Sequence, residues 1–372
     1  MTNWLEVRKL FPALERFVYL STASGGPMSR QAVAAARRYY DEELEVGDTL
    51  WDDWLARVED TRRAVAGVLN AEPSEIALLT NASQGLNHAA RLLGPTGEVV
   101  AARDEFPSVT LPWLLGEYPV TWVEHAPDGV VSLESIERAM SPGTRFVATS
   151  HVNYRTGFRQ DLRALGAICR ARGLRLVVDA TQSFSAFPID VRADDVDVLV
   201  SSCYKWPAAG YGIAVVFVKR EILESARLPA AGWRSARVPL ELLSERLDLA
   251  TEARALELGH PPFAGAFALG AALGLVQEIG IDRIAARIQD LTDCLHATLD
   301  RLGVPIVSPR PREQRAGITL IALPDHRKVV ERLRERGVLA AARGDYIRLA
   351  VHYYNSEADI DRFGEALRAV LS

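Results

Sequence analysis

The sequence predicts an α/β protein with a mostly parallel, seven-stranded sheet in a large domain and a small α+β domain at the C-terminal end. Three observations predict this fold. Seven apolar, β-branched runs occur in the first 220 residues, and helical patterns separate most of them. The runs are apolar throughout, which is typical of strands buried on both faces of a sheet. Strands that alternate with helices indicate parallel pairing through helical crossovers.

The elements of the large domain follow from local pattern. The predicted strands are Ile76–Thr80, Val99–Ala102, Val120–Val123, Phe146–Ser150, Leu174–Asp179, Val196–Ser201 and Ile213–Val218. The predicted helices between them include Val58–Leu69, Gln84–Leu93 and Leu162–Arg172. Such sheets bind ligands beyond the carboxyl ends of their strands, so the residues that follow each strand are the first candidates for chemistry.

The pattern changes after Pro262, where two long helices are predicted at Phe263–Ile279 and Asp282–Arg301. A small α+β unit follows, made of strand Ile318–Leu323, helix Arg327–Arg336, strand Tyr346–Val351 and helix Glu357–Leu371. We therefore expect a large domain at residues 16–258 and a small domain made of residues 1–15 and 259–372.

Composition and charge argue against several classes of protein. The 372 residues are 48% hydrophobic and 24% charged, as in a soluble globular protein. A net charge of −5 without a basic stripe gives no footprint for nucleic acid, and no apolar run approaches the roughly 18 residues of a membrane helix. The N-terminal residues carry charges where a signal peptide needs an apolar stretch, so we expect a cytoplasmic protein without a membrane partner. The three cysteines form no CxxC pair, so neither a disulfide nor a metal site is expected.

Lysine is rare in this chain, and its positions restrict the chemistry. Of the 43 basic residues only four are lysines: Lys9, Lys205, Lys219 and Lys328. Arginine replaces lysine on a surface but not where an amine must lose its proton and attack a carbonyl. Any chemistry of that kind must therefore use one of these positions.

Two strand ends place a carboxylate and a lysine at the same edge of the predicted sheet. Asp179 ends one strand, and Lys205 follows the next strand 26 residues later. Such a pair fits an aldehyde cofactor with a basic ring nitrogen, because the lysine can form a Schiff base and the aspartate can keep the nitrogen protonated. The alternative is a structural salt bridge, which these two residues alone leave open.

Other strand ends add polar and aromatic residues at this edge. The segment Thr80–Gly85 joins a strand to a helix and could bind a phosphate, although a plain helix cap uses the same residue types. Phe106 could lie flat against a cofactor ring, whereas a lone Phe is more often a core residue. Asn153 follows a fourth strand and is either a further contact or a turn residue.

In order and spacing these segments resemble the fold-type I pyridoxal-phosphate enzymes of the class V aminotransferase family, from Val18 to the C-terminus. The resemblance implies a homodimer that acts on an amino acid, with pyridoxal 5′-phosphate on Lys205, Asp179 at its ring nitrogen and Tyr204 as the third catalytic residue. It places the other cofactor contacts at Ser83, Gln84, Phe106, Asn153, Gln182, Ser202, Trp233 and His260. It further implies that Arg348 grips the substrate α-carboxylate, and that Trp233 and His260 lie in segments that reach the neighbouring subunit's site.

Within this family the nearest resemblance is to kynureninases, and it rests on His151–Gly157, Cys203–Lys205, Phe106–Ser108 and Gly232–Trp233. The chain departs from that branch at Leu44, Val109, Gln182 and His260, where kynureninases carry His, an acid, His, and Asn or Thr. Several substrate contacts are thus altered while the cofactor contacts remain. We therefore expect a kynureninase-like enzyme, with an aminotransferase or an isopenicillin N epimerase-like cysteine/cystine C–S lyase as the alternative.

Other functions make demands that the sequence does not meet. A desulfurase needs a mobile cysteine in the loop before the carboxylate-binding arginine, and residues 337–345 contain none. A nicotinamide enzyme on this sheet would need GxGxxG in the first strand-to-helix turn, which Thr80–Gly85 lacks. A non-catalytic binding protein of this fold would not need Lys205, Asp179 and Arg348 together.

Overall fold

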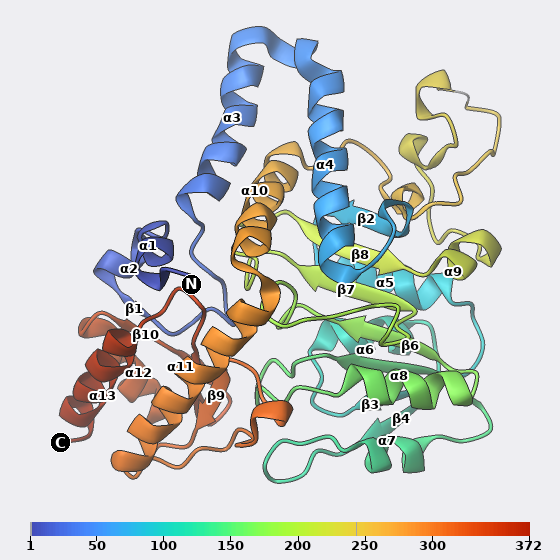
Figure 1. Cartoon of the computed structure of the whole chain (residues 1–372). Helices are drawn as coiled ribbons and strands as arrows, with labels where there is room; N and C mark the ends of the chain where they lie inside the picture. The colour runs from blue at the N-terminus through green and yellow to red at the C-terminus, as the bar shows by residue number, and fades with distance from the viewer. Residues whose placement is uncertain (1, 243) are drawn as a thin grey trace.

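The computed structural model of the chain describes residues 2–242 and 244–372. Its large sheet has the strand order β2-β8-β7-β6-β5-β3-β4 (Figure 1). These strands are β2 (Ile76–Leu79), β3 (Glu98–Ala102), β4 (Val120–Val123), β5 (Thr144–Ser150), β6 (Arg175–Asp179), β7 (Val198–Ser202) and β8 (Ala214–Val218). Strand β8 runs antiparallel to both of its neighbours, and the other pairs are parallel. The prediction of a mostly parallel, seven-stranded sheet is therefore confirmed.

Side chains that alternate along each strand build a hydrophobic layer on each face of this sheet. Leu78 and Leu176 belong to the layer that packs against α4 (Trp51–Leu69), α8 (Leu162–Ala171) and part of α10 (Phe263–Ile279). Their neighbours Ala77 and Val177 belong to the opposite layer, which packs against α5 (Ala82–Leu92) and α6 (Pro107–Leu115). Burial of both faces explains why the strands are apolar throughout.

The C-terminal part is built on a small antiparallel sheet in the order β11-β12-β9. Its strands are β9 (Ile318–Ile321), β11 (Ala341–Arg343) and β12 (Tyr346–Ala350). Helices α11 (Ile281–Arg301), α12 (His326–Glu335) and α13 (Glu357–Leu371) contribute to one hydrophobic cluster with this sheet. Figure 1 shows this part, in orange and red, beside the large sheet.

The beginning of the chain lies against this C-terminal part. Strand β1 (Val18–Tyr19) pairs in parallel with β10 (Val338–Leu339), and Ser21 forms a bridge to Ala350. Residues 20–26 then lead towards the large sheet, where the Gly26 N–H donates to a backbone carbonyl beyond the end of β7 at 2.9 Å. The N-terminal segment thus connects both parts of the molecule.

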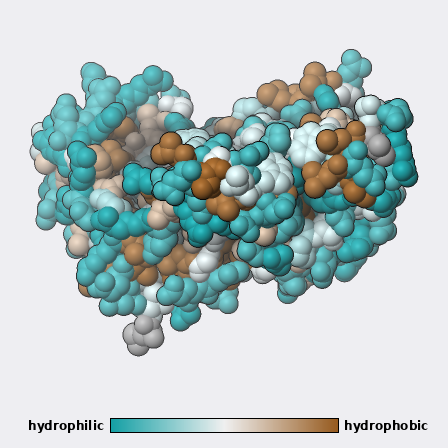
Figure 2. Space-filling view, turned by 90° about the horizontal axis from the view of Figure 1, so that it is seen from above, coloured by the Kyte–Doolittle hydropathy of each residue, from teal (hydrophilic) through white to brown (hydrophobic). Residues whose placement is uncertain are grey.

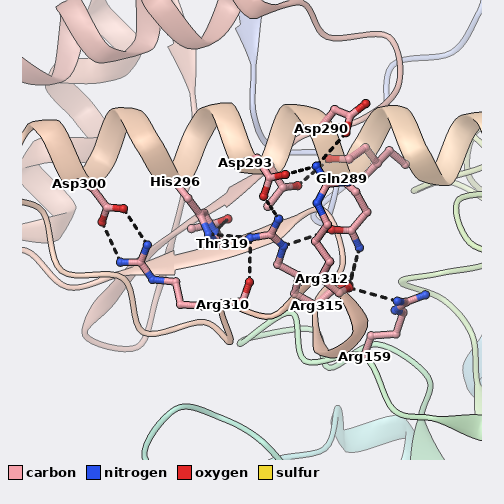
Figure 3. A network of polar contacts seen from close by, with 12 residues as sticks. Arg159, Gln289, Asp290, Asp293, His296, Asp300, Arg310, Arg312, Arg315 and Thr319 are labelled. Carbon is pink, nitrogen blue, oxygen red and sulfur yellow. Dashed lines mark hydrogen bonds and ion pairs between the residues drawn. The ribbon is translucent and has the colours of Figure 1, made fainter.

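A polar network fastens α11 to the segment before β9 (Figure 3). Nη1 of Arg315 donates to Nδ1 of His296 at 3.0 Å, and its other Nη atom pairs with Asp293. Arg310 forms a two-pronged pair with Asp300 at 2.8 and 2.9 Å. The positive charge of Arg310 is thus neutralised by a carboxylate of the chain itself.

The boundaries of the predicted elements agree well with the structure. All seven strands of the large sheet begin and end within two residues of the prediction, and α10 and α13 match it at both ends. Helix α4 begins at Trp51 rather than Val58, and α3 (Arg30–Val46) was not predicted. Helix α3 fully buries only Ala32 among its described side chains, and its other core contacts are the partly buried Ala35, Ala36 and Tyr39, so its apolar pattern is weak.

Helix α10 connects the large sheet to the C-terminal part. Its first part, up to Leu273, belongs to the hydrophobic layer of the large sheet, and Leu275, Val276 and Ile279 belong to the C-terminal cluster. The division of the chain at residue 259 stays a prediction. Over the described residues no helix by itself is long and apolar enough to cross a membrane. Helices α10 and α11 taken together, with a bend of 82° between them, have the length and composition of a membrane span.

Candidate active site

A cavity of about 210 Å³ opens at the carboxyl ends of the central strands. Ser150, Asp179 and Ser202, the last residues of β5, β6 and β7, all line it. The complete lining is Asn81, Ala82, Ser83, Phe106, Ser108, Ser150, Val152, Tyr154, Asp179, Thr181, Gln182, Ser202, Tyr204 and Lys205. The structure thus brings together seven of the residues that the sequence singled out: Ser83, Phe106, Asp179, Gln182, Ser202, Tyr204 and Lys205.

Asp179 is a buried carboxylate at the end of β6. Its Oδ1 accepts a hydrogen bond of 2.8 Å from the backbone N–H of Thr181. Burial raises the pKa of Asp179, whereas the hydrogen bond from Thr181 and the positive charge of Lys205 act in the opposite direction. A buried carboxylate of this kind favours a positively charged or N–H partner in the cavity.

The amine of Lys205 lies near two aromatic rings of the cavity. Its Nζ is 5.7 Å from the ring centre of Phe106 and 5.5 Å from that of Tyr204. Among the described residues, no ion pair joins Lys205 to Asp179, and the lysines that do form ion pairs are Lys9 and Lys219. The two groups are therefore held in one cavity without neutralising each other directly.

Burial lowers the pKa of Lys205 to about 8. The negative charge of Asp179 opposes this shift, while the positive charges of Arg348 and Arg343 add to it. A larger share of the amine is neutral near pH 7 than for an ordinary lysine. The neutral amine is the form that attacks a carbonyl or accepts a proton.

The N-terminus of α5 forms one wall of the cavity. Asn81 caps the helix, because its Oδ1 accepts the N–H of Gln84 at 2.9 Å. Oγ of Ser202 accepts the N–H of Ala82 at 3.3 Å, and Ser83 adds a hydroxyl that lines the cavity. The cap does not exclude a phosphate, because a helix N-terminus with hydroxyls around it suits an anion. Gln84 contributes its backbone to the cap and is not among the lining residues.

Helix α5 approaches the sheet closely at Gly85. A Cβ at this position would lie 2.7 Å from Cγ2 of Val216 and 2.8 Å from Cγ1 of Val200. Only glycine allows this approach, which holds the N-terminus of α5 against the ends of the strands.

Two aromatic pairs border the cavity. Phe106 precedes α6, is 40% exposed, and meets the edge of the Tyr154 ring at a centroid distance of 5.4 Å. Its exposure argues against a core role. Tyr204 stacks on Tyr211 with the ring centres 4.4 Å apart and the planes 19° apart. The partly exposed face of Phe106 is available for stacking against a flat ligand.

Gln182 is held in place by two partners from other segments. Its Nε2 donates to the carbonyl of Ala23 at 3.0 Å, and its Oε1 accepts from Nε1 of Trp206 at 2.8 Å. The Trp206 ring in turn stacks on His352. One N–H of the Gln182 amide remains for a ligand, because a primary amide has two.

Asn153 has the contacts of a turn residue. Its Oδ1 accepts from the backbone N–H groups of Arg155 and Thr156, both at 2.9 Å. Its neighbours Val152 and Tyr154 line the cavity, and Asn153 does not. A contact between Asn153 and a cofactor stays a prediction.

Glu105 is a buried acid beside the cavity that is not among the residues predicted from the sequence. Its Oε1 accepts the backbone N–H of Ser150 at 2.7 Å, and its Oε2 accepts the Ser150 hydroxyl. Ser150 lines the cavity and pairs with Asp179 across β5 and β6. Burial raises the pKa of Glu105 to about 7, and the Ser150 hydrogen bonds oppose this shift. The available signal is an acid directly before Phe106 at a strand end.

Trp233 and His260 lie together but away from this cavity within the chain. Their ring centres are 5.3 Å apart, and His260 also meets Trp51 at 5.4 Å. Trp233 lines a different cavity of about 340 Å³, whose lining residues lie between 231 and 242 and between 244 and 249. A role for the pair in a neighbouring subunit's site stays a prediction.

Arg348 is buried beside the cavity on β12, with 2% of its surface exposed. Its Nη1 donates to the carbonyl of Tyr154, which lines the cavity, at 2.5 Å, and its Nη2 donates to Oγ of Ser24 at 2.8 Å. Burial lowers the pKa of Arg348 to about 9, and the nearby charge of Arg343 adds to the shift. A surface role for Arg348 is excluded by this burial.

The cysteines lie outside the cavity lining. Cys203 is fully buried next to Tyr204, and burial raises the pKa of its thiol. Burial also raises the pKa of Cys169 to about 12. Cys294 is half-buried on α11, and burial raises its pKa as well. High pKa values disfavour the thiolate, the form that attacks sulfur or binds metals.

Comparisons with known proteins agree over nearly the whole chain. Residues 18–363 match the family model described as "Aminotransferase class-V". An uncharacterised aminotransferase of Bacillus subtilis (strain 168) is 29% identical over 95% of this chain and 95% of its own length. A probable cysteine desulfurase of Pyrococcus abyssi is 26% identical over 96% of this chain and 95% of its own length.

Solved structures of the same fold are also known. The apo structure of a cysteine desulfurase from Thermococcus onnurineus NA1 matches with a TM-score of 0.91 and 24% identity. The match covers 99% of this chain and 98% of that one. The likeness establishes the fold of the whole chain, including the C-terminal part.

Proposed function

The chain belongs to the class-V aminotransferase family and is a pyridoxal-phosphate-dependent enzyme; from that premise we propose that it acts on an α-amino acid through Lys205. One observation carries the proposal. Lys205 and Asp179 are buried in the same cavity, next to Phe106, without forming an ion pair with each other. A cation and an anion kept apart beside an aromatic face suit a flat ligand that carries both a carbonyl and a basic ring nitrogen.

The residues of the cavity fit pyridoxal 5′-phosphate. Asp179 would hold the ring nitrogen, Phe106 would lie against the ring, and the free N–H of Gln182 would contact the phenolic oxygen. Ser83 and Ser202, at the N-terminus of α5, would hold the phosphate. When bound, the cofactor withdraws electrons from the substrate Cα and so makes its proton acidic.

Lys205 is the acid and base of the proposed reaction. Its pKa of about 8 leaves both protonation forms populated near neutral pH, as proton transfer in both directions requires. Nζ of Lys205 would take the proton from the substrate Cα and return a proton to the product. Tyr204, whose ring centre lies 5.5 Å from Nζ, restricts where that amine can move.

Arg348 is proposed to bind the substrate α-carboxylate. Its guanidinium is buried next to Tyr154 and pairs with no carboxylate of the described residues, so the charge is available for a substrate. A planar guanidinium binds a carboxylate through two parallel hydrogen bonds, which fixes the orientation of Cα relative to Lys205.

The reaction is proposed to proceed without a cysteine nucleophile. The segment from β10 to β12 contains no cysteine, and none of the three cysteines lines the cavity. Kynureninase-like cleavage is the branch that the motifs His151–Gly157 and Cys203–Lys205 favour. Transamination or C–S elimination is the second candidate, and the names of the aminotransferase and desulfurase relatives favour it.

The test combines chemical labelling with a substrate panel. Borohydride reduction of the holoenzyme and peptide mapping should place the cofactor on Lys205, and Lys205→Ala should lose both colour and turnover. Label on Lys9, Lys219 or Lys328 would contradict the proposal. Kynurenine, cysteine, cystine and alanine, each with and without a keto acid, then separate the branches by their products. If no amino acid changes the spectrum of the holoenzyme, the proposed substrate class is wrong.

A further inference from the structure

Two arginines converge on one hydroxyl beside the candidate active site. Nη2 of Arg348 donates to Oγ of Ser24 at 2.8 Å, and Nη2 of Arg343 donates to the same oxygen at 3.2 Å. The two Nη2 atoms are therefore within about 6 Å of each other. Arg343 lies on β11 and Arg348 on β12. The register between these two antiparallel strands places both side chains on the same face of the hairpin.

Neither of these charges is neutralised by the protein. Over the described ranges, neither Arg343 nor Arg348 forms an ion pair, whereas Arg310 is paired with Asp300. The remaining hydrogen bonds of the two guanidiniums go to neutral carbonyls, those of Ala342 and Tyr154. Two like charges held close together in a partly buried setting repel each other unless an anion joins them.

The arginine pair lies within electrostatic range of the reacting amine. Burial is the largest cause of the lowered pKa of Lys205, and the negative charge of Asp179 opposes it. The positive charges of both arginines lower this pKa further. Arg348 is also joined to the cavity through Tyr154, one of its lining residues. The pair therefore lies close enough to act electrostatically on a substrate amino acid bound beside Lys205.

We propose that Arg343 and Arg348 form a subsite for two anionic groups, so that the preferred substrate is an α-amino acid with a second acidic group on its side chain. The inference rests on the proposed function, in which Arg348 binds the α-carboxylate. A substrate with one carboxylate leaves one positive charge without a partner, and a substrate with two acidic groups neutralises both. Arg343 is then the residue that selects for the acidic side chain.

The experiment compares matched pairs of amino acids by spectral titration of the holoenzyme. Aspartate is compared with asparagine, and glutamate with glutamine, in the wild type and in Arg343→Gln, Arg343→Lys and Arg310→Gln. The wild type should bind the better acid about 30-fold or more tightly than its amide. Arg343→Gln should remove most of this preference without weakening the amide, Arg343→Lys should keep part of it, and the control Arg310→Gln should keep all of it.

Two results of the spectral titration would overturn the proposal. One is a wild type that binds acid and amide equally. The other is an Arg343→Gln variant that loses affinity for both members of a pair equally, because both arginines would then grip the same carboxylate. Calorimetric titration with glutarate and with its half-amide, which carry no amine, tests the subsite separately. If amino acids fail to change the spectrum but glutarate binds more tightly than the half-amide, the proposed function fails and the anionic subsite stands. Equal binding of both overturns the subsite.

Discussion

The protonation of Lys205 depends on residues from distant parts of the sequence. Burial disfavours its positive charge, Asp179 at the end of β6 favours it, and Arg343 and Arg348 on the C-terminal hairpin disfavour it. Substitution of any of these neighbours should therefore shift the amine's titration in a direction set by the sign of the charge removed.

We expect acetylation of Lys205 in the apoenzyme to rise with a midpoint near pH 8, rather than near 10.5. Asp179→Asn should lower the midpoint, because it removes a negative charge that favours the ammonium form. Arg348→Gln should raise it, because it removes a repelling positive charge. Competitive labelling with acetic anhydride and mass spectrometry follows all four lysines in one sample, with exposed Lys9 as the internal reference. Shifts in the same direction for both variants would contradict this account.

Glu105 should make the protein less stable as the pH rises. Its folded pKa of about 7 exceeds the ordinary 4.5, so between these values the folded state holds a proton that the unfolded state has released. Its stabilising contribution is complete below pH 4.5 and is lost as the pH rises through 7, by up to about 3 kcal/mol.

Glu105→Gln mimics the neutral acid and should remove this part of the pH dependence. Urea-unfolding midpoints of wild type and variant at pH 5.5 and 8.5 measure this pH dependence. Glu335→Gln, the same substitution at an exposed position, is the matched control. A variant that loses stability with pH as steeply as the wild type would show that Glu105 has no such role.

Single residues could be predicted from the sequence only where a strand end marks them. Asp179 and Lys205 follow buried strands, and the structure brings both into one cavity. Ser24 and Arg343 act through contacts with segments far along the chain, and no local pattern records such contacts. Arg348 was found through family resemblance rather than through its spacing.

Among the elements, α5 is constrained by its close packing against the large sheet. The absence of a side chain at Gly85 lets the helix pack directly on Val200 and Val216. The position of its N-terminus, and so of the Ser83 hydroxyl relative to Ser202 on β7, depends on this contact. A methyl group at residue 85 must move either the helix or the two valines.

Gly85→Ala should weaken binding of pyridoxal phosphate by about 5- to 100-fold, since overpacking costs roughly 1–3 kcal/mol. Gly274→Ala is the matched control, because a Cβ at this helical position on α10 meets nothing within 4 Å. That change should leave cofactor affinity alone and, by helix propensity, raise stability by up to about 1 kcal/mol. Fluorescence titration of the two apoenzymes with the cofactor measures the difference. Equal affinities would show that the close packing of α5 on the sheet does not affect cofactor binding.

Elements were predictable where burial is two-sided and not where an element is exposed or irregular. The strands of the large sheet carry continuous apolar runs and were recognised within two residues. Helix α3 buries little, and α6 contains Pro112, a residue that disfavours a helix interior. Of the hairpin formed by β11 and β12, the sequence predicts only the second strand, because β11 has no buried residue.

The whole molecule exposes apolar side chains at the end that carries α3 and the segment near residue 240. Figure 2 views this end and shows separate hydrophobic groups on a mostly hydrophilic surface. The exposed residues of these segments are Tyr40, Leu44, Val46, Val238, Leu240, Leu242 and Leu247. Exposed apolar groups of this kind occur at protein interfaces, as the predicted homodimer requires.

If Trp233 and His260 complete a neighbouring subunit's site, two inactive variants should restore each other. Lys205→Ala supplies an intact Trp233 and His260, and His260→Ala or Trp233→Ala supplies an intact Lys205. Mixed dimers should recover up to about a quarter to a half of wild-type activity, because each contains one complete site. Tagged subunits purified in two steps ensure that mixed dimers are assayed. Mixed dimers without recovery would show that each site is built from one chain. The sequence could not decide this, because the second subunit's position is not written in the pattern of one chain.

The pairing of β1 with β10 also sets the order of events during synthesis. Residues 18–26 leave the ribosome early, but their partners near residues 338–350 are made last. Until then the segment that carries Ser24 has neither its partner strand nor the two arginines that converge on it. We therefore expect products of interrupted translation that stop before residue 338 to be inactive, because this segment lacks its partners in them.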